Sequence, residues 1–264
     1  MNNKMLVCDL DGTLLNEYGK IDSVSLDEIK LFCEKGGNFV ICTGRLDQDI
    51  EYVEEQLGFK GEYRISQNGA VIKDKNGKII FHEPISKNHL NKLNKIIFST
   101  NLRTEVSDSQ HRYFPSPRNP EEVAEFIDTS IVVKDLIEKV NTELEPTIYL
   151  TFGKKDDFKT IQHAIQLEFG DEITALQTSP SSLEVFSKKV SKGNAVSYIM
   201  KRTDVDSENL YVAGDAESDI SMFDLTLNSF AVQKANETVK TAARHYVSTV
   251  GDLVKLYIFK EEDK

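Results

Sequence analysis

The first part of the chain alternates apolar runs with amphipathic stretches. Residues 5–10 (MLVCDL) and 38–44 (NFVICTG) are dominated by consecutive apolar residues, the pattern of strands that are buried on both faces. Residues 23–36 and 46–58 have apolar positions at helical spacing, and each stretch ends in glycine. Repeated strand–helix–strand units predict right-handed crossovers and a mainly parallel sheet.

The pattern changes in the middle of the chain. Residues 64–83 predict strands joined by a hairpin with Asn76-Gly77 as its turn. Beyond it, helices mixed with adjacent strands indicate an α+β module with an antiparallel sheet. We expect helices at 85–101 and 156–170, strands at 147–153, 173–179 and 182–187, a loop at 112–122, and either strand or helix at 121–141.

The alternating pattern returns in the last part of the chain. It predicts strands at 209–215 and 229–232, and helices at 191–202, 218–226, 236–245 and 251–259. The predicted fold class is therefore α/β. We expect one sheet domain formed by residues 1–84 and 186–264, split by an α+β module at 85–185.

Composition limits the partners. The 264 residues carry a net charge of -11, which disfavours nucleic acid and anionic membrane, because both need a basic face. The three cysteines, Cys8, Cys33 and Cys42, form no CxxC pair and suit a reducing compartment. No apolar run reaches the length of a membrane span, and Asp9 and Asp11 interrupt any signal-peptide core. We therefore expect a cytoplasmic protein; its oligomeric state is left open.

Three predicted strands end in residues that can bind a charged ligand. The first ends in Asp9 and Asp11, the second in the Thr-Gly pair at 43–44, and the third in Asp215. Ligands of open α/β sheets bind outside the carboxyl ends of the strands, so we expect these residues to converge, with Asp219 beside them. Clustered carboxylates repel each other unless a cation intervenes, and oxygen ligands without His or Cys favour Mg²⁺.

The same strand ends offer groups that suit phosphate oxygens. Hydroxyl and backbone N–H groups occur at residues 12–13 and 43–44 and after Asp215. A positive side chain is also needed, and Lys192, at the start of a predicted helix, is the best candidate. Asp11 lies two residues beyond Asp9, and so on the same side if the strand continues.

Four segments, in this order, resemble the motifs of the haloacid-dehalogenase-like (HAD) phosphohydrolase superfamily: DLDGTLL (9–15), CTGR (42–45), SKGNAV (191–196) and GDAESDISM (214–222). The insertion between the second and third motifs resembles the type IIB capped group. SQNGAVI (66–72) and LEVFSKKVSKG (183–193) resemble the Cof-type sugar-phosphatase branch. The resemblance implies a Rossmann-like, doubly wound parallel-sheet core with an inserted α+β cap.

The resemblance also implies an activity, that of a Mg²⁺-dependent phosphatase acting on small phosphorylated metabolites, most often sugar phosphates. Asp9 would be the nucleophile that becomes an aspartyl-phosphate, and Asp11 the general acid and base. The implied metal ligands are Asp9, the backbone carbonyl of Asp11, and Asp215.

Further roles are implied at the remaining motif positions. The phosphate-binding set implied is Thr43, Gly44 and Lys192, with the Leu10 and Gly12 backbone nearby. Asp219 would orient Lys192 or a metal-bound water, and Arg45 would face the phosphate or the leaving group. Ser218 stands where this branch usually has Asn. Its hydroxyl can still bind phosphate, with a shorter reach.

Other functions stay open. A phosphomutase of the same fold would need a second phosphate site in the inserted module, where the available arginines are Arg103, Arg112 and Arg118. A non-catalytic phospho-receiver also uses paired acids and Mg²⁺, but its phosphorylated Asp ends a later strand, which here ends in Thr43. A degenerate regulatory relative is disfavoured because every principal motif position is filled.

Overall fold

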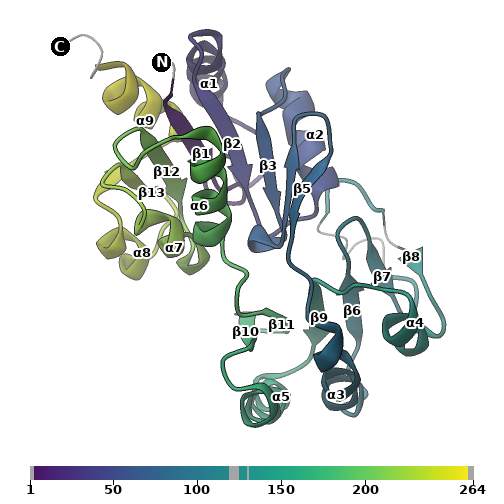
Figure 1. Ribbon diagram of the computed structural model, residues 1–264. Coiled ribbons are helices and arrows are strands. Elements are labelled where there is room, and N and C mark those ends of the chain that lie inside the picture. Colours follow the sequence, from purple (N-terminus) through teal and green to yellow (C-terminus); the bar gives the residue numbers. More distant parts are fainter. Residues whose placement is uncertain (1–2, 119–124, 130, 261–264) are drawn as a thin grey trace. The chain divides into compact units, whose positions relative to one another are not determined.

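The computed structural model describes residues 3–118, 125–129 and 131–260. The chain divides into two compact units (Figure 1). The first unit is formed by two separate segments, Met1–Phe81 and Ser191–Lys264, and the second unit is His82–Val190, inserted between them. The predicted module at 85–185 is slightly shorter than this second unit.

An eight-stranded sheet forms the centre of the first unit (Figure 1). Its strands pair in parallel from β14 to β3, and β3 pairs antiparallel with β4. The predicted α/β class with a mainly parallel sheet is confirmed. In sheet order the strands are β14 (His245–Val247), β13 (Ser229–Val232), β12 (Leu210–Gly214), β1 (Met5–Cys8), β2 (Asn38–Cys42), β3 (Tyr63–Ser66), β4 (Val71–Asp74) and β5 (Ile79–His82).

Helices cover both faces of this sheet, as strands that are apolar on both faces require. Met5 and Val7 of β1 belong to a buried core with Val196 and Met222, on the face that carries α6, α7 and α8. Leu6 alternates with them and is fully buried on the other face, where α1, α2 and α9 lie. The helices are α1 (Ser23–Glu34), α2 (Asp47–Leu57), α6 (Lys192–Thr203), α7 (Ile220–Phe223), α8 (Glu237–Ala242) and α9 (Val250–Leu253), which continues as a π-helix over Val254–Phe259.

Local signals set the ends of the helices that connect the strands. The Asp22 carboxylate accepts a hydrogen bond from the Ser25 backbone N–H at 2.9 Å, so Asp22 is the N-cap of α1. Helix α2 ends at Gly58, whose φ of 76° lies in the left-handed region that glycine adopts without strain. The start of α1 at Ser23 and the glycine that follows α2 agree with the helices predicted at 23–36 and 46–58.

Within its described residues, the second unit packs three α-helices against a six-stranded sheet. Neighbouring strands pair antiparallel except β7 and β8, which are parallel. Leu93, Tyr149, Ile161 and Val185 lie in the core between sheet and helices. In sheet order the strands are β10 (Ile173–Ser179), β11 (Ser182–Ser187), β9 (Ile148–Phe152), β6 (Thr104–Ser107), β7 (Arg112–Phe114) and β8 (Ile131–Val132), and the helices are α3 (Lys87–Phe98), α4 (Leu136–Thr142) and α5 (Lys155–Phe169).

Some predicted elements were wrong. The predicted loop at 112–122 begins with strand β7, and its residues 119–122 lie outside the described residues. Strand β6 was not predicted, because a short polar sequence becomes a strand only through its pairing with β9 and β7. The predicted helix at 236–245 ends at Ala242, and strand β14 follows. The ambiguous segment at 121–141 contains strand β8 and most of α4.

Two further sequence features have a structural counterpart. Cys8 and Cys42 are buried thiols in the central strands, and Cys33 is a half-buried thiol in α1. Across the described part of the chain, the helices are too short or too polar to cross a bilayer.

Candidate active site

The candidate residues lie at one edge of the central sheet. In the parallel register, Cys8 of β1 is beside Ile41 of β2 and Ala213 of β12. Asp9, Thr43 and Asp215 follow these strands within one or two residues, so the three chain segments bring them to the same edge. This is the carboxyl edge, where open α/β sheets bind their ligands.

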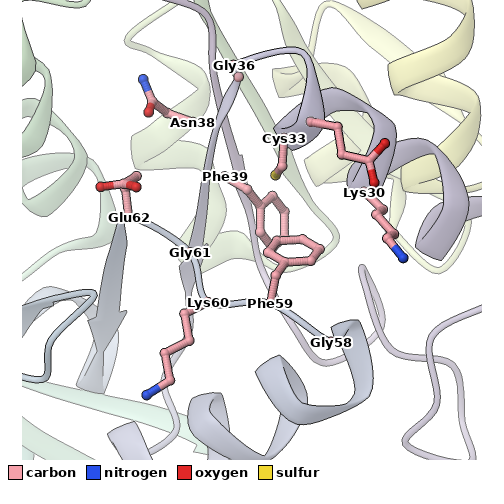
Figure 2. A pocket seen from close by; sticks show the side chains of 12 residues that line it. Lys30, Cys33, Gly36, Asn38, Phe39, Gly58, Phe59, Lys60, Gly61 and Glu62 are labelled. Atoms are coloured by element: carbon pink, nitrogen blue, oxygen red, sulfur yellow. The ribbon is translucent and has the colours of Figure 1, made fainter.

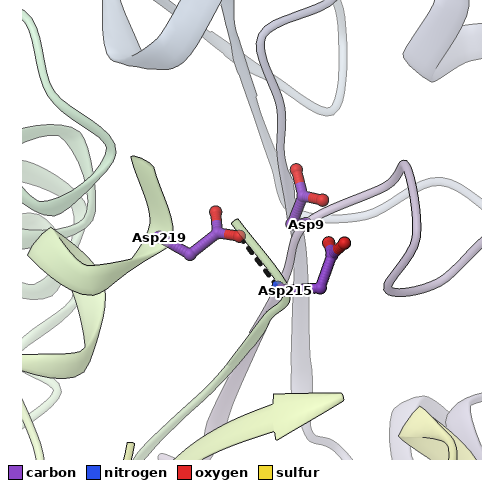
Figure 3. Close-up of side chains that lie close together, drawn as sticks. All are labelled: Asp9, Asp215 and Asp219. Carbon is purple, nitrogen blue, oxygen red and sulfur yellow. Dashed lines mark hydrogen bonds between the residues drawn. The ribbon is translucent and has the colours of Figure 1, made fainter. Parts of the chain in front are cut away.

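Three carboxylates form a cluster at this edge (Figure 3). One oxygen from each of Asp9, Asp215 and Asp219 lies within 4.8 Å of the others. Asp9 and Asp219 are buried, and Asp215 is partly exposed, so the cluster can be reached from solvent on one side. Asp11 is not part of this cluster.

Lys192 joins two of these acids. Lys192, the first residue of α6, is 3% exposed, and its Nζ lies 2.6 Å from Asp9 Oδ1 and 2.6 Å from Asp219 Oδ1. The helix begins there because the Ser191 hydroxyl caps it, accepting from the Asn194 backbone N–H. The two carboxylates outweigh burial and raise the pKa of Lys192, so this side chain stays a cation.

Asp219 uses both of its carboxylate oxygens for structural contacts. Its Oδ1 accepts from Lys192, and its Oδ2 accepts from the backbone N–H groups of Asp215 and Ala216, each at 3.0 Å. Asp219 therefore holds the lysine and also fixes the turn that carries Asp215.

The electrostatics of the cluster favour a bound cation. Burial raises the pKa of Asp9 to about 7, with Lys192 opposing the shift and Asp219 adding to it. Burial and the neighbouring acids also raise the pKa of Asp215. A divalent cation would relieve this repulsion, and the clustered donors are all hard carboxylate oxygens, which suits Mg²⁺.

Thr13 and Gly12 shape the surroundings of Asp215. The Thr13 hydroxyl donates to Asp215 Oδ1 at 2.8 Å, a contact that sequence reasoning did not identify. Gly12 has a φ of 84°, and a Cβ at this position would lie 2.3 Å from Asp215 Oδ2. Only glycine allows both the turn and this close approach.

The Asp11 carboxylate pairs with Arg45, whereas strand alternation predicted that it lies on the same side as Asp9. Strand β1 ends at Cys8, and Leu15 N–H donates to Leu10 O, so the chain turns before Asp11 and strand alternation does not extend to it. Asp11 Oδ2 accepts from Arg45 Nε at 2.6 Å, and Oδ1 accepts from Arg45 Nη2 at 2.8 Å. The same guanidinium donates from Nη1 to Asp49 Oδ2 at 3.0 Å. Arg45 thus joins two acids, and Asp49 was not predicted.

The remaining candidates lie around this edge with different exposure. Thr43 is 1% exposed, and its hydroxyl accepts from the Arg45 backbone N–H at 3.2 Å. The Gly12 N–H donates to Leu15 O at 3.2 Å, and the Leu10 side chain is buried. A Cβ added at Gly44 would lie 3.1 Å from Asn68 Oδ1. Ser218 is exposed, and its backbone carbonyl accepts from the Ser221 hydroxyl.

A cavity of about 460 Å³ lies elsewhere in the first unit (Figure 2). Phe39 and Phe59 line it with Cys33, near the residues where β2 and β3 begin. Asp9, Thr43 and Asp215 follow the opposite ends of the strands. The cavity is therefore separate from the acid cluster.

The fold and the site together define a class. A doubly wound parallel sheet with clustered carboxylates and a buried lysine at its carboxyl edge is typical of α/β enzymes that act on a ligand at that edge. Comparison with known families agrees: a family model of haloacid dehalogenase-like hydrolases matches residues 6–252. The chain therefore belongs to the haloacid dehalogenase-like hydrolase family, which confirms the resemblance seen in the four motifs.

Individual relatives cover nearly the whole chain. Phosphatase YwpJ of Bacillus subtilis is 26% identical over 265 residues, covering 91% of this chain and 93% of its own. A Thermotoga maritima protein of known crystal structure has a TM-score of 0.85 at 24% identity, covering 99% of this chain and 97% of its own. A solved structure described as the HAD subclass IIB sugar phosphatase BT4131 has a TM-score of 0.78 at 18% identity, covering 98% of this chain and 99% of its own.

Proposed function

We propose that the protein is a Mg²⁺-dependent phosphatase that hydrolyses small phosphate monoesters through an aspartyl-phosphate on Asp9. The main support is one arrangement: Asp9 follows the central strand β1 and lies beside Asp215, and the buried Lys192 Nζ lies 2.6 Å from Asp9 Oδ1. The charges of Lys192 and of a bound Mg²⁺ would offset the repulsion between the Asp9 carboxylate and an anionic phosphate.

The residues at the cluster fit the expected metal. Asp9 and Asp215, with the backbone carbonyl of Asp11, would hold Mg²⁺; both oxygens of Asp219 already accept hydrogen bonds from Lys192 and the backbone. Bound there, Mg²⁺ would offset the negative charge of the phosphate and the carboxylates. Asp219 is assigned to hold Lys192 and the Asp215 turn.

The protein groups would then share the work of phosphoryl transfer. A carboxylate oxygen of Asp9 forms a bond to phosphorus while the ester bond to the leaving oxygen breaks. Asp11 gives a proton to that oxygen, and later takes one from the water that attacks the aspartyl-phosphate. Lys192, Thr43, Gly44 and the backbone at residues 10–12 position the phosphoryl oxygens, with Ser218 at the exposed rim.

Sugar phosphates are the proposed substrates, and the second unit is the proposed cap that selects among them. The sugar phosphatase BT4131 shares the fold along the whole chain, which supports this choice. A mutase would need a second phosphate site in the second unit, formed by arginines whose charge is not already neutralised by acids. Instead Arg103 pairs with Glu105, and Arg112 and Arg118 both pair with Glu125. The free thiols support the proposed cytoplasmic location.

Phosphate release from nitrophenyl phosphate, with Mg²⁺ or with EDTA, tests the activity. Wild type should turn over only with Mg²⁺, and Asp9→Asn should lose turnover while keeping a native circular-dichroism spectrum. The matched control is Asp27→Asn, an exposed acid on α1, which should behave as wild type. Wild-type rates in Asp9→Asn would reject the proposal. A screen of sugar phosphates then addresses the substrate.

A further inference from the structure

Asp49 is a buried acid next to the proposed active site. It is 1% exposed, lies in the first turn of α2, and its Oδ2 accepts from Arg45 Nη1 at 3.0 Å. The other edge of the same guanidinium donates from Nε and Nη2 to the two oxygens of Asp11. The planar guanidinium is thus held between two acids, one buried and one half-exposed.

The element that carries Asp49 is firmly attached to the sheet. Arg64 of β3 is 1% exposed and pairs with Asp47 at 2.9 Å, Glu51 at 3.1 Å and Glu54 at 3.0 Å, acids on successive turns of α2. Asp47 also accepts from Lys73 at 2.7 Å. Charge-assisted pairs along one side of the helix fix its position, so Asp49 is presented from a rigid support.

Asp11, in contrast, has little support of its own. It follows the end of β1, and its side chain is 53% exposed. An exposed carboxylate samples several rotamers unless a partner fixes it. Arg45 provides that partner, but a long side chain at a strand end is itself mobile unless its far end is held. Asp49 holds it.

The geometry points to Asp49 as a positioning residue that acts through Arg45 to place the Asp11 carboxylate. This inference rests on the proposed function, in which Asp11 transfers the proton. Asp49 lies outside the cluster of Asp9, Asp215 and Asp219, and the Arg45 guanidinium links it to Asp11. If Asp49 only stabilised the first turn of α2, its replacement would lower kcat equally with and without Arg45.

A double-mutant cycle separates the two roles, with kcat and KM for nitrophenyl phosphate as the readout. In the wild-type background, Asp49→Ala should lower kcat about tenfold with KM nearly unchanged, a fraction of the 10²–10⁴ that general acid–base catalysis typically contributes. In the Arg45→Ala background the same substitution should change kcat by less than about twofold, because the connecting side chain is gone. Equal losses in both backgrounds, or no loss in either, would overturn the inference.

Asp47→Ala is the matched control, since Asp47 is a buried acid on the same helical turn but pairs with Arg64 and Lys73. It should lower the denaturation midpoint without changing kcat, because Glu51 and Glu54 still pair with Arg64 and keep α2 in place. If Asp49→Ala does not fold, the cycle is run with Asp49→Asn, which keeps an acceptor oxygen; we then expect a loss of about threefold that again disappears with Arg45→Ala. Failure of the proposed function looks different, because wild type itself would then release no phosphate.

Discussion

Replacing Asp219 by Asn is a sharp test of how the site is held together. In the structure three donors converge on this fully buried carboxylate: Lys192 Nζ at 2.6 Å on Oδ1, and the backbone N–H groups of Asp215 and Ala216 at 3.0 Å on Oδ2. Asparagine has the same shape but offers one acceptor oxygen and one amide group that is itself a donor. Either the lysine or the two backbone groups must face another donor.

The size of the effect follows from these contacts. Removing one partner of a buried charge pair costs about 3–5 kcal/mol, because the remaining charge is left without compensation. Lys192 keeps Asp9 as a second partner, so we expect a loss of about 3 kcal/mol in the free energy of unfolding. With an m-value of about 3 kcal/mol/M in urea for a chain of this size, the midpoint should fall by about 1 M.

Urea denaturation followed by circular dichroism measures this shift. Asp224→Asn is the matched control, since Asp224 is an exposed acid at the end of α7, and its effect should stay within about 0.5 kcal/mol. A midpoint for Asp219→Asn within experimental error of wild type would refute the reasoning. The three hydrogen bonds would then contribute nothing to the stability of the fold.

Three other predictions follow from the same geometry. Without Mg²⁺, Asp9 in the folded protein keeps its proton up to its raised pKa of about 7, whereas in the unfolded chain it loses the proton near pH ~4. The unfolding free energy of wild type should therefore fall by about 4 kcal/mol relative to that of Asp9→Asn as the pH rises from the lower to the higher value. A difference that stays constant with pH would contradict the assigned burial of Asp9. Thr13→Val removes the hydroxyl that donates to Asp215, so calorimetry should show Mg²⁺ binding about tenfold weaker; unchanged affinity would exclude Asp215 as an oriented ligand. Arg64→Leu removes the cation that pairs with the buried Glu54, whereas Asp47 keeps its pair with Lys73; the substitution should cost about 3–5 kcal/mol in chemical denaturation. Lys75→Leu, in an exposed pair with Glu62, should cost about 1 kcal/mol or less, and similar costs for both variants would show that burial does not decide the effect.

The central sheet and its acidic edge could be predicted from sequence because both depend on local patterns. Continuous apolar runs identify β1, β2 and β12, and the residue that follows each run must lie at the carboxyl edge of a parallel sheet. Asp9 and Asp215 come together for this reason alone. Lys192 begins a helix at the same edge, and its Nζ contacts Asp219.

The partners of Asp11 could not be predicted in the same way. Strand alternation was the available argument, and it fails once the chain turns after Cys8 and the Leu15 N–H bonds back to Leu10. The pairing of Asp11 with Arg45 depends on loop conformations and on the position of α2, neither of which has a periodic signal. The same holds for Thr13 with Asp215.

The strands of the second unit show a related limit. Strands β6 and β7 are three or four residues long and carry polar side chains, so neither length nor alternation distinguishes them from loop. β6 becomes a strand through its long-range pairing with β9, and β7 becomes one through its pairing with β6.

Trapping the covalent intermediate tests the central claim most directly. Wild type is mixed with a phosphate ester labelled on phosphorus, quenched in acid within one turnover, digested, and mapped by mass spectrometry. We predict the label on Asp9, and no label in Asp9→Asn. A labelled peptide from another part of the chain, or substrate hydrolysis with every peptide unlabelled, would contradict the assignment of Asp9 as the nucleophile.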